Sequence, residues 1–166
     1  MPSKKMIKKL NDQLNFEYFS SNVYLQMSAW AQSKALTGAA AFLKNHAAEE
    51  LQHMHRLFDY INEVGAMAIV GKIDAPQIEH KSIAEIFTDI LAHEKLVTKK
   101  IHDLTSTAWE EKDYATFNFL QWYVEEQREE EALVQDIVDK IDMIGTDKRS
   151  LFLLDRELAR IAANHE

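Results

Sequence analysis

Glu50 and His53, three residues apart, are the pair in this chain best placed to bind a metal ion. They lie inside a long helical pattern, and residues at this spacing project from the same face of an α-helix. Counting by heptads places Glu50 in a stripe that is otherwise apolar. The stripe also contains Leu43, Ala47, Met54, Leu57, Ile61 and Val64. A carboxylate in that stripe is expected to be buried, and an unpaired buried carboxylate costs several kcal/mol.

Three further helical patterns carry a polar interruption in an apolar stripe. The interruption is Glu17 in the first pattern, Glu94 in the third, and Gln127, followed one turn later by Glu130, in the fourth. Each first interruption lies about 12 to 14 residues from the start of its helix, so helices packed as a bundle bring them to a similar height. Four inward carboxylates without Lys or Arg in the same stripes repel one another strongly at low dielectric. We therefore expect cations among them.

The donor atoms in this layer indicate which cation it binds. Carboxylates with one histidine and no thiolate are typical of iron or manganese sites and not of structural zinc sites. Glu50 lies centrally and is expected to bridge two ions, with Glu17 and His53 completing one site and Glu94 and Glu130 the other. Four carboxylates balance two ferrous ions, and oxide or hydroxide must balance the charge added by oxidation. Because nitrogen ligands are few, the ferric product is held weakly, which favours its release.

Long helices must position these residues, because the chain has only four Gly and two Pro and is dominated by 3.6-residue periodicity. The expected helices span residues 4–34, the stretch from the connection at 36–38 to 65, and residues 82–111, 113–145 and 147–163. Signals for helix ends are Ser82 with Glu85, Asp113, Thr146 or Asp147, Gly65 and Gly145. The pattern predicts an all-α fold.

The segment 66–81, which contains Gly71 and Pro76, is a long connection with no helical pattern. Extended, it spans ~50 Å, which exceeds the ~42 Å of a helix of about 28 residues. It can therefore cross over from one end of a helix pair to the other, whereas the short connection at 36–38 makes the first two helices antiparallel neighbours. We expect a single domain of residues 1–166, with an up-down-down-up four-helix bundle at 4–145 and a short fifth helix.

Composition excludes several classes of protein. The chain of 166 residues with 46% apolar content suffices for one core, and the absence of cysteine excludes disulfides and thiolate metal sites. There is no apolar signal region at the start and no apolar run near 18 residues, so we expect a soluble cytoplasmic protein without a membrane partner. A net charge of −8 disfavours nucleic acid as a partner and suits cations.

Three segments together resemble the bacterial non-haem ferritins. They are Asn-Phe-Glu-Tyr at 15–18, His-Ala-Ala-Glu-Glu-Leu-Gln-His at 46–53 and Phe-Asn-Phe-Leu-Gln-Trp-Tyr at 117–123. The resemblance covers the whole chain, including the crossover and the short fifth helix. It implies a hollow cage of 24 identical subunits that oxidises Fe(II) with O₂ or H₂O₂ and stores the ferric mineral inside.

The resemblance also implies roles for individual residues. It assigns the first iron site to Glu17, Glu50 and His53, and the second to Glu50, Glu94 and Glu130 with Gln127 nearby. It assigns a third iron site to Glu49, Glu126, Glu129 and Glu130, although spacing alone leaves the first three equally consistent with plain surface. Tyr24 matches a tyrosine beside the first site, where it would hydrogen-bond a ligand or supply an electron.

Some positions depart from related families. Bacterioferritins carry a methionine haem ligand directly after the bridging glutamate, where this chain has Leu51, so no haem is expected. Their fourth helix carries Glu-x-x-His, where this chain has Gln127-x-x-Glu130. Twelve-subunit relatives lack a fifth helix. Two alternatives remain open: a metal-free helical scaffold with hydrated acids, and a di-iron protein that retains its metals.

The remaining polar and aromatic residues near these positions are expected to be structural. Glu125 and Glu131 suit a solvated helix face, Trp122 suits core packing, and His46 is expected to be structural although it shares the face of the metal-binding pair. The other histidines are expected at the surface: His55, His80, His93, His102 and His165.

Overall fold

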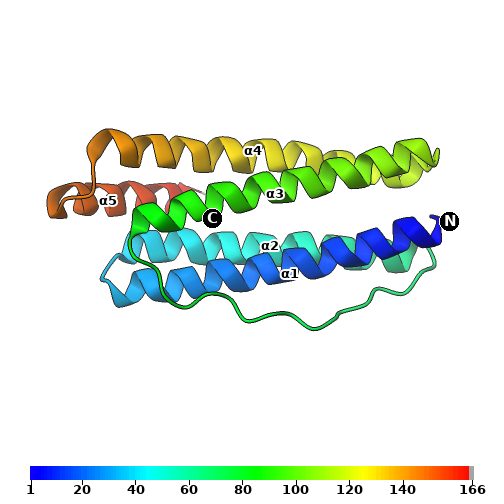
Figure 1. Ribbon diagram of the computed structural model, residues 1–166, viewed down its shortest axis with the longest axis horizontal. Coiled ribbons are helices and arrows are strands. Elements are labelled where there is room, and N and C mark those ends of the chain that lie inside the picture. The colour runs from blue at the N-terminus through cyan, green and yellow to red at the C-terminus, as the bar shows by residue number, and fades with distance from the viewer. Residues whose placement is uncertain (165–166) are drawn as a thin grey trace.

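The computed structural model describes residues 1–164, which form five α-helices and no strand (Figure 1). The helices are α1 (Lys4–Ser33), α2 (Thr37–Glu63), α3 (Ile83–Glu110), α4 (Tyr114–Ile144) and α5 (Lys148–Asn164). The long connection after α2 runs back along the bundle, so α3 points in the same direction as α2 and α4 in the same direction as α1. This confirms the expected up-down-down-up bundle with a crossover and a short fifth helix. His165 lies outside the described residues.

Side-chain caps fix where several helices begin. The Ser82 hydroxyl accepts a hydrogen bond from the backbone N–H of Glu85 at 3.1 Å, as the sequence predicts. The Glu85 carboxylate reaches back one residue further than in a full capping box, and accepts from the N–H of Lys81 at 2.6 Å. Asp113 and Asp147 similarly accept from backbone N–H groups in the first turns of α4 and α5.

Two asparagines on α1 hold the crossover against the bundle. Asn11 donates to the carbonyl of Met67 at 3.4 Å and accepts from the N–H of Ile69 at 2.7 Å. One turn later, Asn15 donates to the carbonyl of Ile69 at 2.8 Å and accepts from the N–H of Gly71 at 2.7 Å. These side chains pair with the extended backbone as a neighbouring strand would, which satisfies its polar groups without a sheet.

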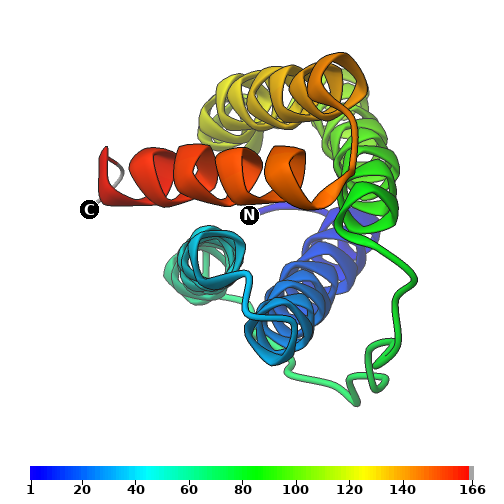
Figure 2. The ribbon, with the colours of Figure 1, turned by 90° about the vertical axis from the view of Figure 1, so that its left-hand side faces the viewer.

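Helix α5 lies across one end of the bundle (Figure 2) and docks on its own chain. The Asp155 carboxylate accepts from the N–H groups of Gly38 at 3.1 Å and Ala39 at 2.8 Å, in the first turn of α2. A negative charge at this position interacts favourably with the positive N-terminal end of the α2 dipole. The contact requires glycine, because a Cβ at Gly38 would lie 1.9 Å from the carbonyl oxygen of Asp155.

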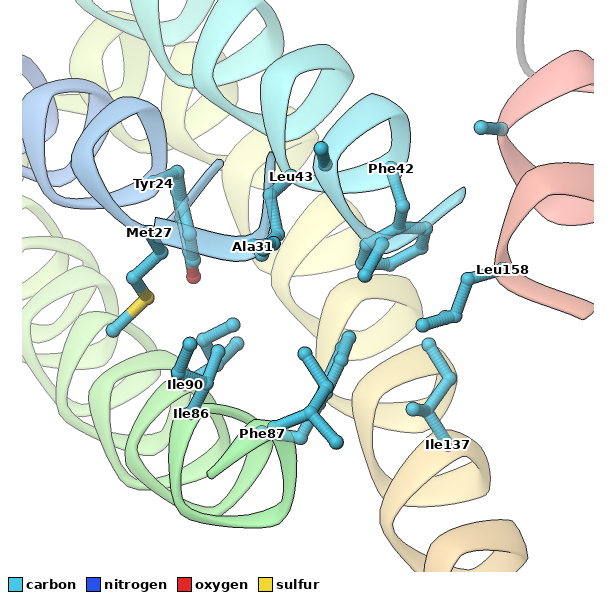
Figure 3. Packing of buried hydrophobic residues seen from close by; sticks show 14 of the residues in the cluster. Tyr24, Met27, Ala31, Phe42, Leu43, Ile86, Phe87, Ile90, Ile137 and Leu158 are labelled. Carbon is cyan, nitrogen blue, oxygen red and sulfur yellow. The ribbon is translucent and has the colours of Figure 1, made fainter. Parts of the chain in front are cut away.

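The apolar core is divided into two clusters along the bundle axis. Figure 3 shows part of the cluster near α5, where side chains from all five helices point inward. The second cluster fills the other end. On every long helix, the buried acidic residues fall between the stretches that supply the two clusters. Within the described residues, no helix is long and apolar enough to cross a membrane.

Candidate metal centre

A buried polar layer separates the two apolar clusters, and all four long helices contribute to it. It consists of Glu17 from α1, Glu50 and His53 from α2, Glu94 from α3, and Gln127 and Glu130 from α4. None of these side chains is more than 6% exposed. The structure therefore brings together the six residues that the sequence assigns to the first two iron sites.

The first group within this layer is Glu17, Glu50 and His53. One ligand atom from each residue lies within 4.8 Å of the other two. Glu17 Oε2, Glu50 Oε2 and His53 Nδ1 are buried and have no hydrogen-bond partner in the part of the chain that the structure describes. Glu50 Oε2 lies 3.3 Å from His53 Nδ1. Buried polar atoms without hydrogen bonds are costly in a protein interior, and a cation bound among these three would satisfy them.

The second group is partly satisfied by hydrogen bonds from neighbouring side chains. Glu94 accepts from the Tyr24 hydroxyl through Oε1 and from Gln127 Nε2 at 2.9 Å through Oε2. Glu130 Oε2 is 2.9 Å from His46 Nε2. The Tyr24 hydroxyl therefore contacts a residue assigned to the second site, and not one of the first. Gln127 orients Glu94 through its amide N–H.

The four acids assigned to a third iron site lie on one side of this layer. Glu49, Glu126, Glu129 and Glu130 line a cavity of about 210 Å³. Glu129 is exposed, whereas Glu49 and Glu126 are half-buried. His46, expected to be structural, hydrogen-bonds Glu130, and its ligand atom lies within 4.8 Å of those of Glu49 and Glu130.

Burial and mutual repulsion set the protonation of the layer. Burial, followed by the charges of neighbouring carboxylates, raises the pKa of Glu17 and Glu50 well above normal and that of Glu94 to about 7. Burial opposes the charge of His46, but its hydrogen bond to Glu130 prevails and raises its pKa to about 9. Burial also works against ionisation of Glu130, yet the contact with His46 leaves its pKa lowered. Protons thus partly balance the carboxylates, and a divalent cation can replace them.

Neighbouring groups orient the His53 ring so that Nδ1 faces the layer. His53 Nε2 lies 3.8 Å from Glu126 Oε1, and the Tyr123 hydroxyl donates to the His53 carbonyl at 2.7 Å. The Trp122 ring packs edge-on to the imidazole at 5.4 Å between centroids, with Arg56 above the indole at 4.4 Å. Carboxylates behind metal-binding histidines commonly fix the tautomer in this way. Trp122 is 36% exposed, and so is not the core residue that the sequence predicted.

Sequence reasoning missed Gln13. Its amide donates to Glu17 Oε1 at 2.7 Å, and the side chain is only 3% exposed. The signal was present, because Gln13 precedes Glu17 by four residues and therefore lies on the same face of α1. A polar residue one turn from an inward acid is a candidate hydrogen-bond donor to it.

Two histidines expected at the surface are in fact half-buried. His93 stacks on the Phe16 ring at 5.2 Å between centroids, with Nε2 2.7 Å from the Ser20 hydroxyl, and burial lowers its pKa to about 4. His80 packs edge-on to Trp30 at 5.9 Å. Both predictions were wrong because contacts outside the core stripes cover these residues. His93 lies where α3 meets α1, and His80, in the crossover, packs against α1. Glu125, His55 and His102 are exposed as expected, whereas Glu131 is half-buried.

Known proteins share this fold and sequence. A family model described as a ferritin-like domain matches residues 7–144. The bacterial non-heme ferritin-like protein of Haemophilus influenzae is 51% identical over 162 residues, which cover 98% of each chain. A bacterial non-heme ferritin of Escherichia coli is 46% identical over 157 residues, or 95% of each chain.

Solved structures agree with these matches. The open pore ferritin from Archaeoglobus fulgidus superposes with a TM-score of 0.92 at 43% identity, over 95% of this chain and 96% of that one. Chlorobium tepidum ferritin gives a TM-score of 0.86 at 48% identity, over 95% and 97%. The chain therefore belongs to the ferritin family of iron-storage proteins, and its relatives there are bacterial non-haem ferritins.

Proposed function

We propose that this chain oxidises Fe(II) at an intrasubunit di-iron centre and stores the Fe(III) as a mineral inside a cage of 24 identical subunits. The observation that carries the oxidation step is the group of three buried ligand atoms that make no hydrogen bond among the described residues, on Glu17, Glu50 and His53. Beside it lie two more buried carboxylates, so the layer supplies enough negative charge for two divalent ions. Membership of the ferritin family supports storage and assembly.

Iron is the substrate in this scheme. One Fe(II) binds to Glu17, Glu50 and His53, and the other to Glu50, Glu94 and Glu130. Each ion gives one electron, so the pair reduces O₂ to the peroxide level or H₂O₂ to water, and water supplies the oxide or hydroxide that balances the ferric charge. Fe(III) then leaves past the acids of the third site to mineralise. The protein contributes positioning and anionic ligands, and the redox chemistry is that of the metal.

The environment of the bridging glutamate supports a haem-free protein. Leu51 follows Glu50 and packs, partly buried, against the second apolar cluster, where it offers no sulfur ligand. Carboxylate-rich sites suit ions that bind and leave, and the sequence has no cysteine, so it offers no thiolate to hold a transition metal permanently.

The test is to mix metal-free protein with excess Fe(II) in air and measure oxidation and the ferric iron that stays in solution. We expect rapid oxidation and hundreds of ferric ions retained per assembly. Retention of about two ions per chain would instead identify a di-iron protein that keeps its metals. Oxidation no faster than in protein-free buffer would identify a metal-free scaffold and would contradict the proposal.

A further inference from the structure

Gln13 holds one oxygen of a proposed iron ligand and leaves the other free. Its Nε2 donates to Glu17 Oε1 at 2.7 Å across one turn of α1, while Glu17 Oε2 has no hydrogen-bond partner among the described residues. Both side chains are buried, at 3% and 0% exposure, so water does not substitute for either contact. Glu17 is grouped with Glu50 and His53, one ligand atom of each lying within 4.8 Å of the others.

The other terminal carboxylates of the layer are bound differently. Glu94 accepts hydrogen bonds on both oxygens, and Glu130 is paired with a histidine. Glu17 has a neutral amide donor on one oxygen and a second oxygen that is buried without a hydrogen-bond partner among the described residues. A lysine or arginine at this position would pair with Glu17 and repel an incoming cation.

We propose that Gln13 is a positioning residue, which fixes the rotation of the Glu17 carboxylate so that Oε2 is ready to bind the ion in the first site. The inference rests on the proposed function of that site. A carboxylate attached through rotatable bonds loses freedom when it binds a metal, and a hydrogen bond already made to its outer oxygen removes part of that cost. Hydrogen bonds to charged groups are among the stronger ones in proteins.

Gln13 also lines a cavity of about 230 Å³ on the α1–α3 side, together with Lys9, Asp12, Lys100, Asp103 and Leu104. Its side chain therefore separates a charged outer recess from Glu17. A change at Gln13 acts either by removing the hydrogen-bond donor or by opening the layer to water, and two variants distinguish these effects. Gln13→Met keeps the length of the side chain and removes the donor. Gln13→Asn keeps an amide but is one methylene shorter.

The experiment measures Co²⁺ binding to the assembled, metal-free protein, by its visible absorption and by calorimetry, together with the initial oxidation rate over a range of Fe(II) concentrations in air. For Gln13→Met we expect about ten-fold weaker Co²⁺ binding at the first site and a similar rise in the Fe(II) concentration for half-maximal rate. The maximal rate should stay within about two-fold. The matched control is Gln135→Met, because Gln135 donates to Asp139 at 2.9 Å with the same four-residue spacing on an exposed face. The control should bind as the unmodified protein does.

Normal Co²⁺ affinity in Gln13→Met would overturn the proposal, and so would a defect seen in Gln13→Asn alone, which would indicate that Gln13 only closes the layer. Weakened binding in Gln13→Met supports it, whether or not Gln13→Asn is also affected. Thermal unfolding of each variant shows that the effect is local. If the unmodified protein fails to bind Co²⁺ at Glu17, Glu50 and His53, the di-iron assignment itself fails, which is a separate result.

Discussion

Glu50 is shared by both proposed iron sites, and its surroundings suit a carboxylate that bridges two ions. It is 1% exposed, lies within the first group of ligand atoms, and is close enough to Glu94 for that charge to raise its pKa. Its Oε2 has no hydrogen-bond partner among residues 1–164. A carboxylate can contact two ions at once because each of its oxygens carries lone pairs.

Glu50→Ala is expected to slow the initial oxidation of Fe(II) by about 100-fold or more, since even the outer partners of metal ligands affect activity on the scale of 10- to 100-fold. The proposed cage should still assemble, because the change removes a repulsive charge from the core. Stopped-flow absorbance at low Fe(II) and light scattering measure the two properties. The control is Glu125→Ala on the exposed face of α4, and an unchanged initial rate in Glu50→Ala would refute the bridging role.

At the scale of elements, the crossover depends on Asn15 for two hydrogen bonds, one of them to the N–H of Gly71. Asn15→Ala is expected to accelerate hydrogen exchange at that amide by about five- to ten-fold, because the net contribution of one hydrogen bond is ~1 kcal/mol. The core helices should exchange as before. In the control Asn62→Ala, the amide of Ala68 should be exposed instead, since Asn62 accepts from it at 3.1 Å. Equal protection of Gly71 in both variants would show that other contacts hold the segment.

The docking of α5 depends on the lack of a side chain at Gly38. Gly38→Ala is expected to shift α5 away from α2 and lower the free energy of unfolding by ~1–3 kcal/mol, because the added methyl meets backbone. Chemical denaturation and hydrogen exchange along α5 measure these effects. Gly71→Ala is the control, since its added methyl would meet nothing closer than Asn15 Oδ1 at 3.5 Å. Native protection of α5 in Gly38→Ala would exclude this account of the docking.

The helices and their ends could be predicted from the sequence because caps and apolar periodicity are local. Ser82 and Asp113 cap helices as expected, and the acids placed inward by heptad counting are buried. Other features depend on neighbours distant in the chain. The seating of α5 on α2 requires a match between Asp155 and Gly38 that no periodicity encodes. The roles of donors such as Gln13 depend on which oxygen of an acid they reach.

For the whole molecule, the titration of the buried layer couples stability to pH. The folded pKa of Glu94, about 7, is above its normal value, so the unfolded chain loses this proton at lower pH than the folded protein does. Its contribution to stability therefore falls as pH rises from about 4.5 to 7. The folded pKa of His46 is about 9, so its stabilisation is complete below about 6.5 and is lost as pH rises through 9. Titration of Glu94 and of His46 therefore lowers the free energy of unfolding as pH rises.

The metal-free protein is thus expected to lose a few kcal/mol of stability between pH 5 and pH 9, measured by chemical denaturation. Saturating Co²⁺ should flatten this dependence and raise the melting temperature, most strongly at high pH, because the ion binds deprotonated ligands of the folded state. A Glu94→Gln variant should lose the part of the slope below pH 7. A metal-free protein that becomes more stable over this range would contradict the assigned titrations.

The division of the core into two clusters has a consequence for how the folded chain moves. Apolar contacts between the helices are interrupted at mid-length. The metal-free bundle therefore has two apolar ends, joined by four helices through a layer of buried acids. Cations bound in this layer would hold the four helices together at their midpoint. The two ends of the bundle should fluctuate independently in the metal-free protein. Their fluctuations should become coupled once cations are bound.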